Sequence, residues 1–418
     1  MAGAERAIFV AINDNLRAWY EMLIPFVLSL RATDFDGRVV VIGYGLTAEK
    51  TAILRGQGVE VVAASSAWTL PLGRYIEVAA FCAAHPEIGK AALYDADIWF
   101  CSPRLDLFSF IDRDGLYACP DPLFCEFVIA PLIGPKRDEN WQRVVTTILA
   151  TYGHALQAGL VAGTTAAWAD FAEHVRRCAG AIGTDFQNVF GLDTTFLHLW
   201  AAANPLVLLP KTQNFITRWG VAEVAEGGPS PFAASDSGEA IRAIHMAGNI
   251  RFFDRWRFYG NQGARALQEG AAFALAPGDL HAVPDAGPEW EGYQEACARH
   301  GLRLTGLRRE VEDRDALSFV STRAGLTILC EGNAEMTFEV AADTIDLNVY
   351  ISHPSGFPSP IRRSVTCGGG VAASQNDLMA HYRYGLVRGT PITLSSTSLA
   401  GQHSRCIWLL SGKPEIEQ

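Results

Sequence analysis

Hydrophobic positions in the first part of the chain form short continuous runs that alternate with helix-like segments. The runs "RAIFVAI" (6–12), "GRVVVIGYG" (37–45) and "VEVVAA" (59–64) are largely apolar, which is typical of strands buried on both faces. Helical spacing of apolar residues follows two of them, at 19–31 and 47–58. Strands that alternate with helices predict a parallel sheet covered on both sides, so we expect the N-terminal half to have an α/β fold.

The pattern changes after residue 262. A helical segment at 288–302 leads into short strand-like runs bounded by Gly, Pro and Ser, namely "ALSFVST", "LTILCEG", "MTFEVA", "TIDLNVYIS", "HYRYGLVRG", "PITLSS" and "RCIWLLSG". Such runs predict a β-sandwich or jelly-roll-like domain. The expected organisation is an α/β domain at 1–262, a linker with a helix at 263–302 and a β-rich domain at 303–418.

Composition and charge restrict the class of protein. The chain has 418 residues, of which 49% are hydrophobic and 19% charged, so we expect folded structure nearly throughout. Its formal net charge of −11 and the lack of a basic stretch argue against a nucleic-acid-binding protein. An anionic ligand would therefore need a metal ion to screen its charge.

The N-terminal sequence and the cysteines indicate a soluble, cytoplasmic protein. "MAGAERAIFVAINDN" lacks the layout of a secretory signal, and no apolar run is long enough for a membrane helix. The nine cysteines are odd in number and scattered, with no C-x-x-C pair, which favours reduced structural thiols over disulfides or a zinc site.

Two carboxylates end the stretch "KAALYDADIWF" (90–100), which otherwise reads as a buried strand. In an extended chain Asp95 and Asp97 would point to the same face, at the carboxyl end where α/β sheets bind ligands. Apolar neighbours make unpaired carboxylates costly, so a cation or a basic side chain should answer them. Oxygen ligands suit Mg²⁺ or Mn²⁺, whereas a solvated strand end is the simpler alternative.

This stretch and three later ones, in order, resemble GT-A glycosyltransferases similar to glycosyltransferase family 8. The D-x-D of the family corresponds to Asp95 and Asp97, and the later segments are "LQAGLVAGTTAAWADFAEHV" (156–175), "FGLDTTFLHLW" (190–200) and "AIHMAGNIRFF" (243–253). The resemblance covers about residues 6–257. It implies a GT-A, Rossmann-like fold, a nucleotide-sugar donor with UDP as the expected nucleotide, and a divalent cation, Mn²⁺ or Mg²⁺.

The resemblance also implies roles for individual residues. Asp95, Asp97 and His245 would hold the metal, and Asp95 would also contact the ribose. The donor would be bound by Asn13, Asp14, Asn15, Arg74, Asp95, Gly159, Gly248 and Arg251. Structural alternatives stay open: Asn and Asp also cap helices, a lone histidine is often structural, and Arg74 could be a surface charge of its helix.

Catalytic roles fall to Asp193 and Gln157 through the same resemblance. Asp193 would bind sugar hydroxyls, while Gln157 and Ala158 stand where the family has Asn, and Thr194 and Thr195 replace its Gln and second Asp. The family order suggests a retaining reaction assisted by the leaving phosphate. An inverting reaction would need a carboxylate base, for which Asp193 or Asp185 is available.

Two other functions are compatible with the sequence. A sugar-nucleotidyltransferase also binds Mg²⁺ through carboxylates, but "NDNLRAWYEM" lacks the glycine-rich basic loop expected after the first strand. A glycan- or partner-binding protein on an inactive scaffold is the second, with Tyr382, Tyr384 and Trp408 as sugar-stacking candidates, although their spacing favours the core. The acceptor (glycan, lipid-linked or protein) and a homo-oligomeric state are left open.

Overall fold

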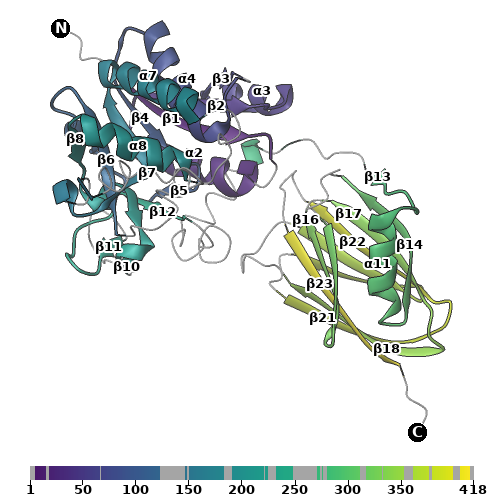
Figure 1. The fold of residues 1–418 in the computed structure, drawn as a ribbon. Helices are drawn as coiled ribbons and strands as arrows, with labels where there is room; N and C mark the ends of the chain where they lie inside the picture. The colour runs from purple at the N-terminus through teal and green to yellow at the C-terminus, as the bar shows by residue number, and fades with distance from the viewer. Residues whose placement is uncertain are drawn as a thin grey trace. The chain divides into compact units, whose positions relative to one another are not determined.

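The computed structural model describes residues 5–15, 18–65, 67–122, 146–147, 150–182, 191–220, 222–224, 232–247, 271–273, 275, 280–310, 317–331, 333–352, 361–375, 379–398 and 405–414. The chain forms two compact units, Met1–Phe273 (unit 1) and Ala274–Gln418 (unit 2) (Figure 1). The division between them lies inside the segment 263–302, and the helix of that segment belongs to unit 2.

Among the described residues of unit 1, seven strands form one sheet in the order β3-β2-β1-β4-β7-β6-β8 (Figure 1). The first four strands in this order are parallel, whereas β7 is antiparallel to both β4 and β6. The expected α/β fold is therefore confirmed, with one reversed strand. The strands are β1 (Glu5–Asn13), β2 (Arg38–Tyr44), β3 (Glu60–Ala63), β4 (Ile88–Tyr94), β6 (Leu116–Asp121), β7 (Ala155–Thr164) and β8 (Leu206–Leu208).

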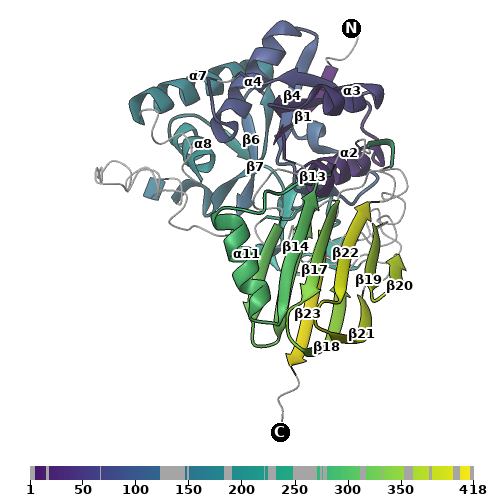
Figure 2. The same ribbon diagram turned by 90° about the vertical axis from the view of Figure 1, so that its right-hand side faces the viewer.

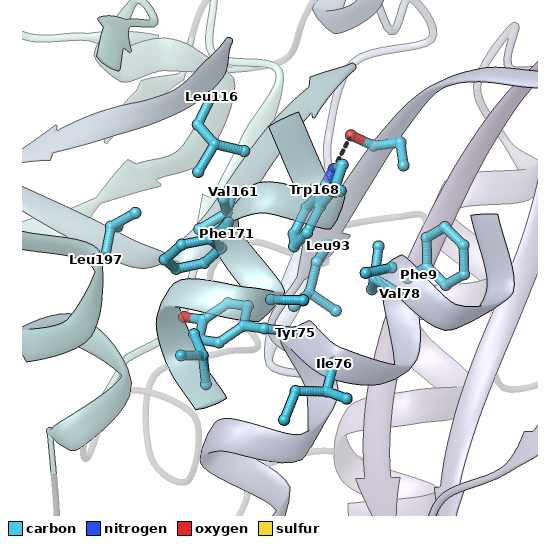
Figure 3. Packing of buried hydrophobic residues seen from close by; sticks show 14 of the residues in the cluster. Phe9, Tyr75, Ile76, Val78, Leu93, Leu116, Val161, Trp168, Phe171 and Leu197 are labelled. Carbon is cyan, nitrogen blue, oxygen red and sulfur yellow. Dashed lines mark hydrogen bonds between the residues drawn. The ribbon is translucent and has the colours of Figure 1, made fainter. Parts of the chain in front are cut away.

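Helices α4 (Leu70–Ala84) and α7 (Thr165–Ile182) lie side by side on this sheet, and α8 (Leu192–Ala203) packs beside them (Figure 1). Their aromatic residues interlock in the core, where the Tyr75 and Phe171 rings lie 4.9 Å apart (Figure 3). The indole of Trp168 donates a hydrogen bond to the Ala91 carbonyl of β4 at 3.1 Å. This contact ties α7 to the strand that leads into the carboxylate pair.

The remaining helices of unit 1 follow the predicted positions. A π-helical turn (Trp19–Leu23) precedes α2 (Ile24–Arg31), and α3 (Ala48–Gly56) begins after Thr47, whose hydroxyl accepts from the Lys50 amide. Short 3₁₀ turns lie at Leu107–Ser109, Lys211–Asn214, Thr217–Trp219 and Ala271–Phe273. No helix among the described residues is long and apolar enough to cross a membrane. The described cysteines, Cys82, Cys101, Cys119, Cys178, Cys297, Cys330 and Cys367, are free thiols.

The prediction of one continuous strand over 90–100 is wrong. Strand β4 ends at Tyr94, and β5 (Ile98–Phe100) begins after a turn and enters a different sheet, in the order β5-β12-β9. The apolar residues on both sides hid the break, because two buried strands joined by a short turn read as one run. The partners are β12 (Ala243–His245) and β9 (Phe215–Ile216), and a separate pair is formed by β10 (Ala222–Val224) and β11 (Phe232–Ala234).

Unit 2 is a β-sandwich, which confirms the predicted β-rich domain. Its described strands form two antiparallel sheets, β13-β14-β17-β22-β19-β20 and β15-β16-β23-β18-β21, whose inward residues share one core that also includes residues of α11 (Pro288–Ala298) (Figure 2). The strands are β13 (His281–Ala282), β14 (Leu302–Arg309), β15 (Leu317–Thr322), β16 (Gly325–Glu331), β17 (Ala334–Val340), β18 (Thr344–Ser352), β19 (Ile361–Cys367), β20 (Gly370–Gln375), β21 (Met379–Val387), β22 (Pro391–Ser398) and β23 (Arg405–Pro414).

The aromatic residues considered as sugar platforms belong to this sandwich core. Trp408 is fully buried, and Tyr382 and Tyr384 are partly buried against the same cluster. The interpretation of these residues as core is therefore correct for Trp408, and Tyr382 and Tyr384 pack against the same core with part of each side chain exposed.

Candidate functional site

The turn between β4 and β5 holds the two aspartates, and its backbone is fixed from two sides. The Asp95 amide donates to the Gly159 carbonyl of β7 at 2.9 Å, and the Asp97 carbonyl accepts from the Met246 amide at 3.0 Å. His245 pairs with Ile98 in the antiparallel register of β12 and β5. Residues 150 positions apart in the sequence are thus brought together by two different sheets.

Asp95, Asp97 and His245 form a group of three possible metal ligands. The Nε2 atom of His245 lies 3.4 Å from Asp97 Oδ1 and 3.6 Å from Asp95 Oδ2, and one ligand atom from each residue lies within 4.8 Å of the others. Neighbouring ligands around a small octahedral cation are about 3 Å apart, which is close to the two distances from His245 Nε2. The same three residues were predicted from the sequence as metal ligands, and the structure places them together.

Gly159 allows His245 to approach the carboxylates. A Cβ atom at this position would lie 2.3 Å from His245 Cε1 and 2.7 Å from its Nδ1, well inside van der Waals contact. The sequence predicts that Gly159 permits close approach of the backbone to the donor sugar. In the structure the group that approaches it is the imidazole, and contact with a sugar stays a prediction.

Arg74 lies on α4 and is only 5% exposed, so the alternative of a surface charge is wrong. Its Nη1 donates to Asp95, and its Nη2 donates to Asp193 Oδ2 at 2.7 Å and to the Ala158 carbonyl at 3.3 Å. Burial favours the neutral form of the guanidinium, but the carboxylates of Asp95 and Asp193 outweigh it and raise the pKa of Arg74. The guanidinium of Arg74 therefore balances part of the negative charge of Asp95 and Asp193, as expected from the sequence.

Asp193 sits in the first turn of α8, beside the guanidinium of Arg74. Its Oδ1 accepts from the Thr194 amide at 2.8 Å, and its Oδ2 accepts from Arg74. Burial raises the pKa of this carboxyl, while the neighbouring Arg74 lowers it and Asp95 raises it further. Asp193 is thereby linked through Arg74 to the metal-ligand group.

Gln157 is buried on β7, and both ends of its amide bind the protein. Its Nε2 donates to the Pro120 carbonyl at 2.9 Å, and its Oε1 accepts from Asn214 Nδ2 at 2.7 Å. The same Asn214 nitrogen lies 3.5 Å from His245 Nδ1. These contacts link Gln157 to His245 through Asn214. A direct catalytic role for Gln157 stays a prediction. Asn214 was missed, because the 3₁₀ turn that holds it has no recognisable motif.

Asn13, Asp14 and Asn15 follow the buried part of β1 and are exposed. The Oδ1 atom of Asn15 accepts from the Ala18 amide, three residues on, at 3.2 Å, as a capping side chain does. Asp14 forms an ion pair with Lys50, whose ammonium is buried and lies 5.7 Å from the Trp19 ring centroid. Sequence reasoning did not find Lys50, which reads as an ordinary helix-surface lysine. Contacts of Asn13, Asp14 and Asn15 with a nucleotide stay predictions.

Three residues from the sequence predictions lie outside the described residues. They are the donor-binding candidates Gly248 and Arg251 and the alternative base Asp185.

Comparison with protein-family models gives no match, and comparison with curated proteins gives no significant match. Similar solved structures include the galactosyltransferase LgtC in complex with donor and acceptor sugar analogs, 15% identical, covering 65% of this chain and 97% of LgtC with a TM-score of 0.42. An active-site mutant of LgtC is 14% identical over 65% of this chain and 97% of that chain, with a TM-score of 0.40. The bifunctional glycosyltransferase WbbM is 13% identical over 59% of this chain and 46% of its own, with a TM-score of 0.33.

Proposed function

We propose that unit 1 is a metal-dependent glycosyltransferase that uses a nucleotide-sugar donor, with a UDP-sugar as the expected donor. The observation that supports it best is the convergence of Asp95, Asp97 and His245 beside Arg74, at the carboxyl end of β4. A bound divalent cation would stabilise the negative charge that develops on a departing nucleoside diphosphate.

The charges of the site fit a divalent cation. Asp95, Asp97 and Asp193 contribute three negative charges and Arg74 one positive charge, so these four side chains leave two negative charges to balance. Asp97 is only 4% exposed, and a buried carboxylate is costly unless a cation or hydrogen bonds answer it. Two carboxylates with one imidazole suit Mn²⁺, and Mg²⁺ is the alternative.

The remaining residues would orient the donor. Arg74 would hold Asp95 in place and present a positive field to the diphosphate, while Asn13, Asp14 and Asn15 would face the nucleobase and ribose. Each carboxylate oxygen of Asp193 accepts one hydrogen bond and keeps a further lone pair for a sugar hydroxyl. A retaining reaction is proposed from the resemblance.

Calorimetric titration with UDP, GDP and CDP, with and without Mn²⁺, tests the proposal. We expect one nucleotide, UDP, to bind tightly only with Mn²⁺, and Asp97→Asn to abolish the metal-dependent part of binding. Asp36→Asn is the matched control, because this exposed carboxylate pairs only with Arg6 among the described contacts. Equal nucleotide affinity with and without Mn²⁺, or wild-type behaviour of Asp97→Asn, would contradict the proposal.

A further inference from the structure

The amide of Gln157 has only one chemically acceptable orientation. Its nitrogen faces the Pro120 carbonyl, which can only accept, and which also accepts from Trp219 Nε1 at 3.2 Å. An inverted amide would place two oxygens against each other in a buried site, since Gln157 is 3% exposed. Gln157 Oε1 must therefore point toward Asn214.

The orientation of the Gln157 amide also determines the orientation of the Asn214 amide. Because Gln157 Oε1 is an acceptor, Asn214 must present its –NH₂ group to it, at 2.7 Å. The same nitrogen lies 3.5 Å from His245 Nδ1, so its second hydrogen is available to that atom. Asn214 is fully buried, and its Oδ1 has no hydrogen-bond partner among the described residues.

A donor that faces His245 Nδ1 decides where the ring carries its proton. A neutral imidazole has one N–H and one lone pair, so Nδ1 offers the lone pair to Asn214 and Nε2 carries the hydrogen. That hydrogen faces the carboxylates of Asp97 and Asp95, 3.4 and 3.6 Å away. The ring lies against Gly159 of β7, in the space that a Cβ atom at this position would occupy.

We infer that the hydrogen-bond chain Pro120–Gln157–Asn214 holds His245 as the Nε2–H tautomer, and that Gln157 and Asn214 are positioning residues that restrain metal ligation by this histidine. The inference rests on the metal site of the proposed function. It assigns to Gln157 a task that differs from contact with the substrate.

Ligation through His245 Nε2 requires a proton rearrangement. The Nε2 proton would leave to solvent and Nδ1 would take up a proton from solvent, so the ring would stay neutral. Rotation of the Asn214 amide would then offer Oδ1 to the new Nδ1–H, at the loss of the hydrogen bond to Gln157. Asp95 and Asp97 would hold a bound cation, and the amide chain would set how strongly the imidazole of His245 adds to them. Mutation of outer partners that support a ligand typically lowers metal affinity about 10- to 100-fold. Because this chain opposes ligation, we expect its loss to raise the affinity by a factor of similar size.

The first test observes the tautomer directly in the metal-free protein. Long-range ¹H–¹⁵N spectra of full-length protein with ¹⁵N-labelled histidine, recorded at alkaline pH, distinguish the two tautomers, and His245→Gln assigns the resonances. We expect Nε2–H in the wild type. An Nδ1–H ring in the wild type would overturn the inference, whether or not the protein binds a metal.

The second test removes the hydrogen bond between Gln157 and Asn214 by substitution. Gln157→Met keeps the side-chain length but removes the acceptor that fixes Asn214, so we expect the tautomer to shift toward Nδ1–H and Mn²⁺ affinity to rise about tenfold. Asn214→Ala should also shift the tautomer and provides a second, smaller substitution. Asn204→Ala is the control, because its amide binds the Trp200 carbonyl at the end of α8.

The outcomes separate this inference from the proposed function. Unchanged tautomer and Mn²⁺ affinity in folded Gln157→Met and Asn214→Ala would overturn the role of the chain. A wild-type protein that shows Nε2–H but binds no Mn²⁺ would contradict the proposed function while supporting the tautomer assignment.

Discussion

Arg74 joins Asp95 to Asp193 through its two terminal nitrogens, so one buried guanidinium connects the candidate metal ligands with the start of α8. The two carboxylates lie almost one hundred positions apart in the sequence. Their common partner supplies one positive charge to two partly buried carboxylates.

Arg74→Met should lower the free energy of unfolding by about 3 kcal/mol, because two carboxylates lose the cation that compensates them. Arg74→Lys should restore little of this loss, since a single ammonium cannot span both carboxylates as a planar guanidinium does. Urea unfolding measures both variants. Arg55→Met, on the exposed side of α3, is the control. A Lys variant as stable as the wild type would contradict the bridging role.

Gly159→Ala should weaken Mn²⁺ binding at least about tenfold, because the added Cβ would displace the His245 ring. Gly180→Ala on α7 is a matched control, since its Cβ would meet nothing within 4 Å and should leave Mn²⁺ binding unchanged. This control should stabilise the protein slightly, by about 0.5–1 kcal/mol. Calorimetry with Mn²⁺ alone provides the readout. Equal affinities of the two variants would show that His245 does not ligate.

Stability should fall as the pH drops from about 6.5 to about 4, because His198 is held neutral. Its Nε2 accepts from the Leu156 amide at 3.0 Å, and its Nδ1 faces the Thr194 carbonyl at 2.7 Å. Burial lowers the pKa of His198 to about 4, whereas an unfolded histidine titrates near 6.5. Between these values the unfolded chain binds a proton that the folded chain does not, which costs up to about 3 kcal/mol.

Urea unfolding at several pH values measures this loss. His198→Gln should flatten the dependence, and His281→Gln, an exposed position of β13, should not. Burial also lowers the pKa of His174, so part of the slope should remain in the first variant. A slope unaffected by His198→Gln would assign the pH dependence to other groups.

Asp14→Asn should destabilise unit 1 by about 3 kcal/mol, because the buried Lys50 ammonium would lose its carboxylate partner. Lys50→Met combined with Asp14→Asn should recover most of the loss. If Asp14 also contacts the ribose, this folded double variant should bind UDP more weakly while it keeps its Mn²⁺ affinity. Loss of Mn²⁺ binding in the double variant would instead indicate a distorted site.

Trp408→Ala should destabilise the sandwich of unit 2 by about 3–5 kcal/mol, as expected for removal of a fully buried aromatic ring. Val371→Ala, at a 67% exposed position of β20, should change stability little. Thermal unfolding of the full chain compares them. A Trp408→Ala variant that unfolds like the wild type would contradict the place of this residue in the core.

The sequence predicted secondary structure best where the apolar residues followed one clear pattern, of either a strand or a helix. Alternating strands and helices predicted the α/β sheet, and the short runs of the C-terminal part correspond to β15–β18 and β21–β23. Strand β14 and the pair β19 and β20 were not predicted, since charged residues and glycines interrupt their apolar alternation. The break between Tyr94 and Ile98 also escaped prediction, because hydrophobicity does not show when a buried chain changes sheets.

Within the site, the metal-ligand candidates could be found because a resemblance marked them. Arg74 was chosen on the same ground, but its burial and its bond to Asp193 depend on the packing of α4 against α8. Asn214 and Lys50 could not be found, because each acts through a neighbour that only the tertiary structure supplies.

The turn at Asp95–Asp97 is shared between two sheets, since the Asp95 amide is bonded to β7 and the Asp97 carbonyl to the residue after β12. Any sliding of the small sheet against the large one would therefore change the separation of the two carboxylates. If the proposed metal site is occupied, its preferred ionic radius follows from how the two sheets pack, and substitutions far from the ligands would alter its metal selectivity.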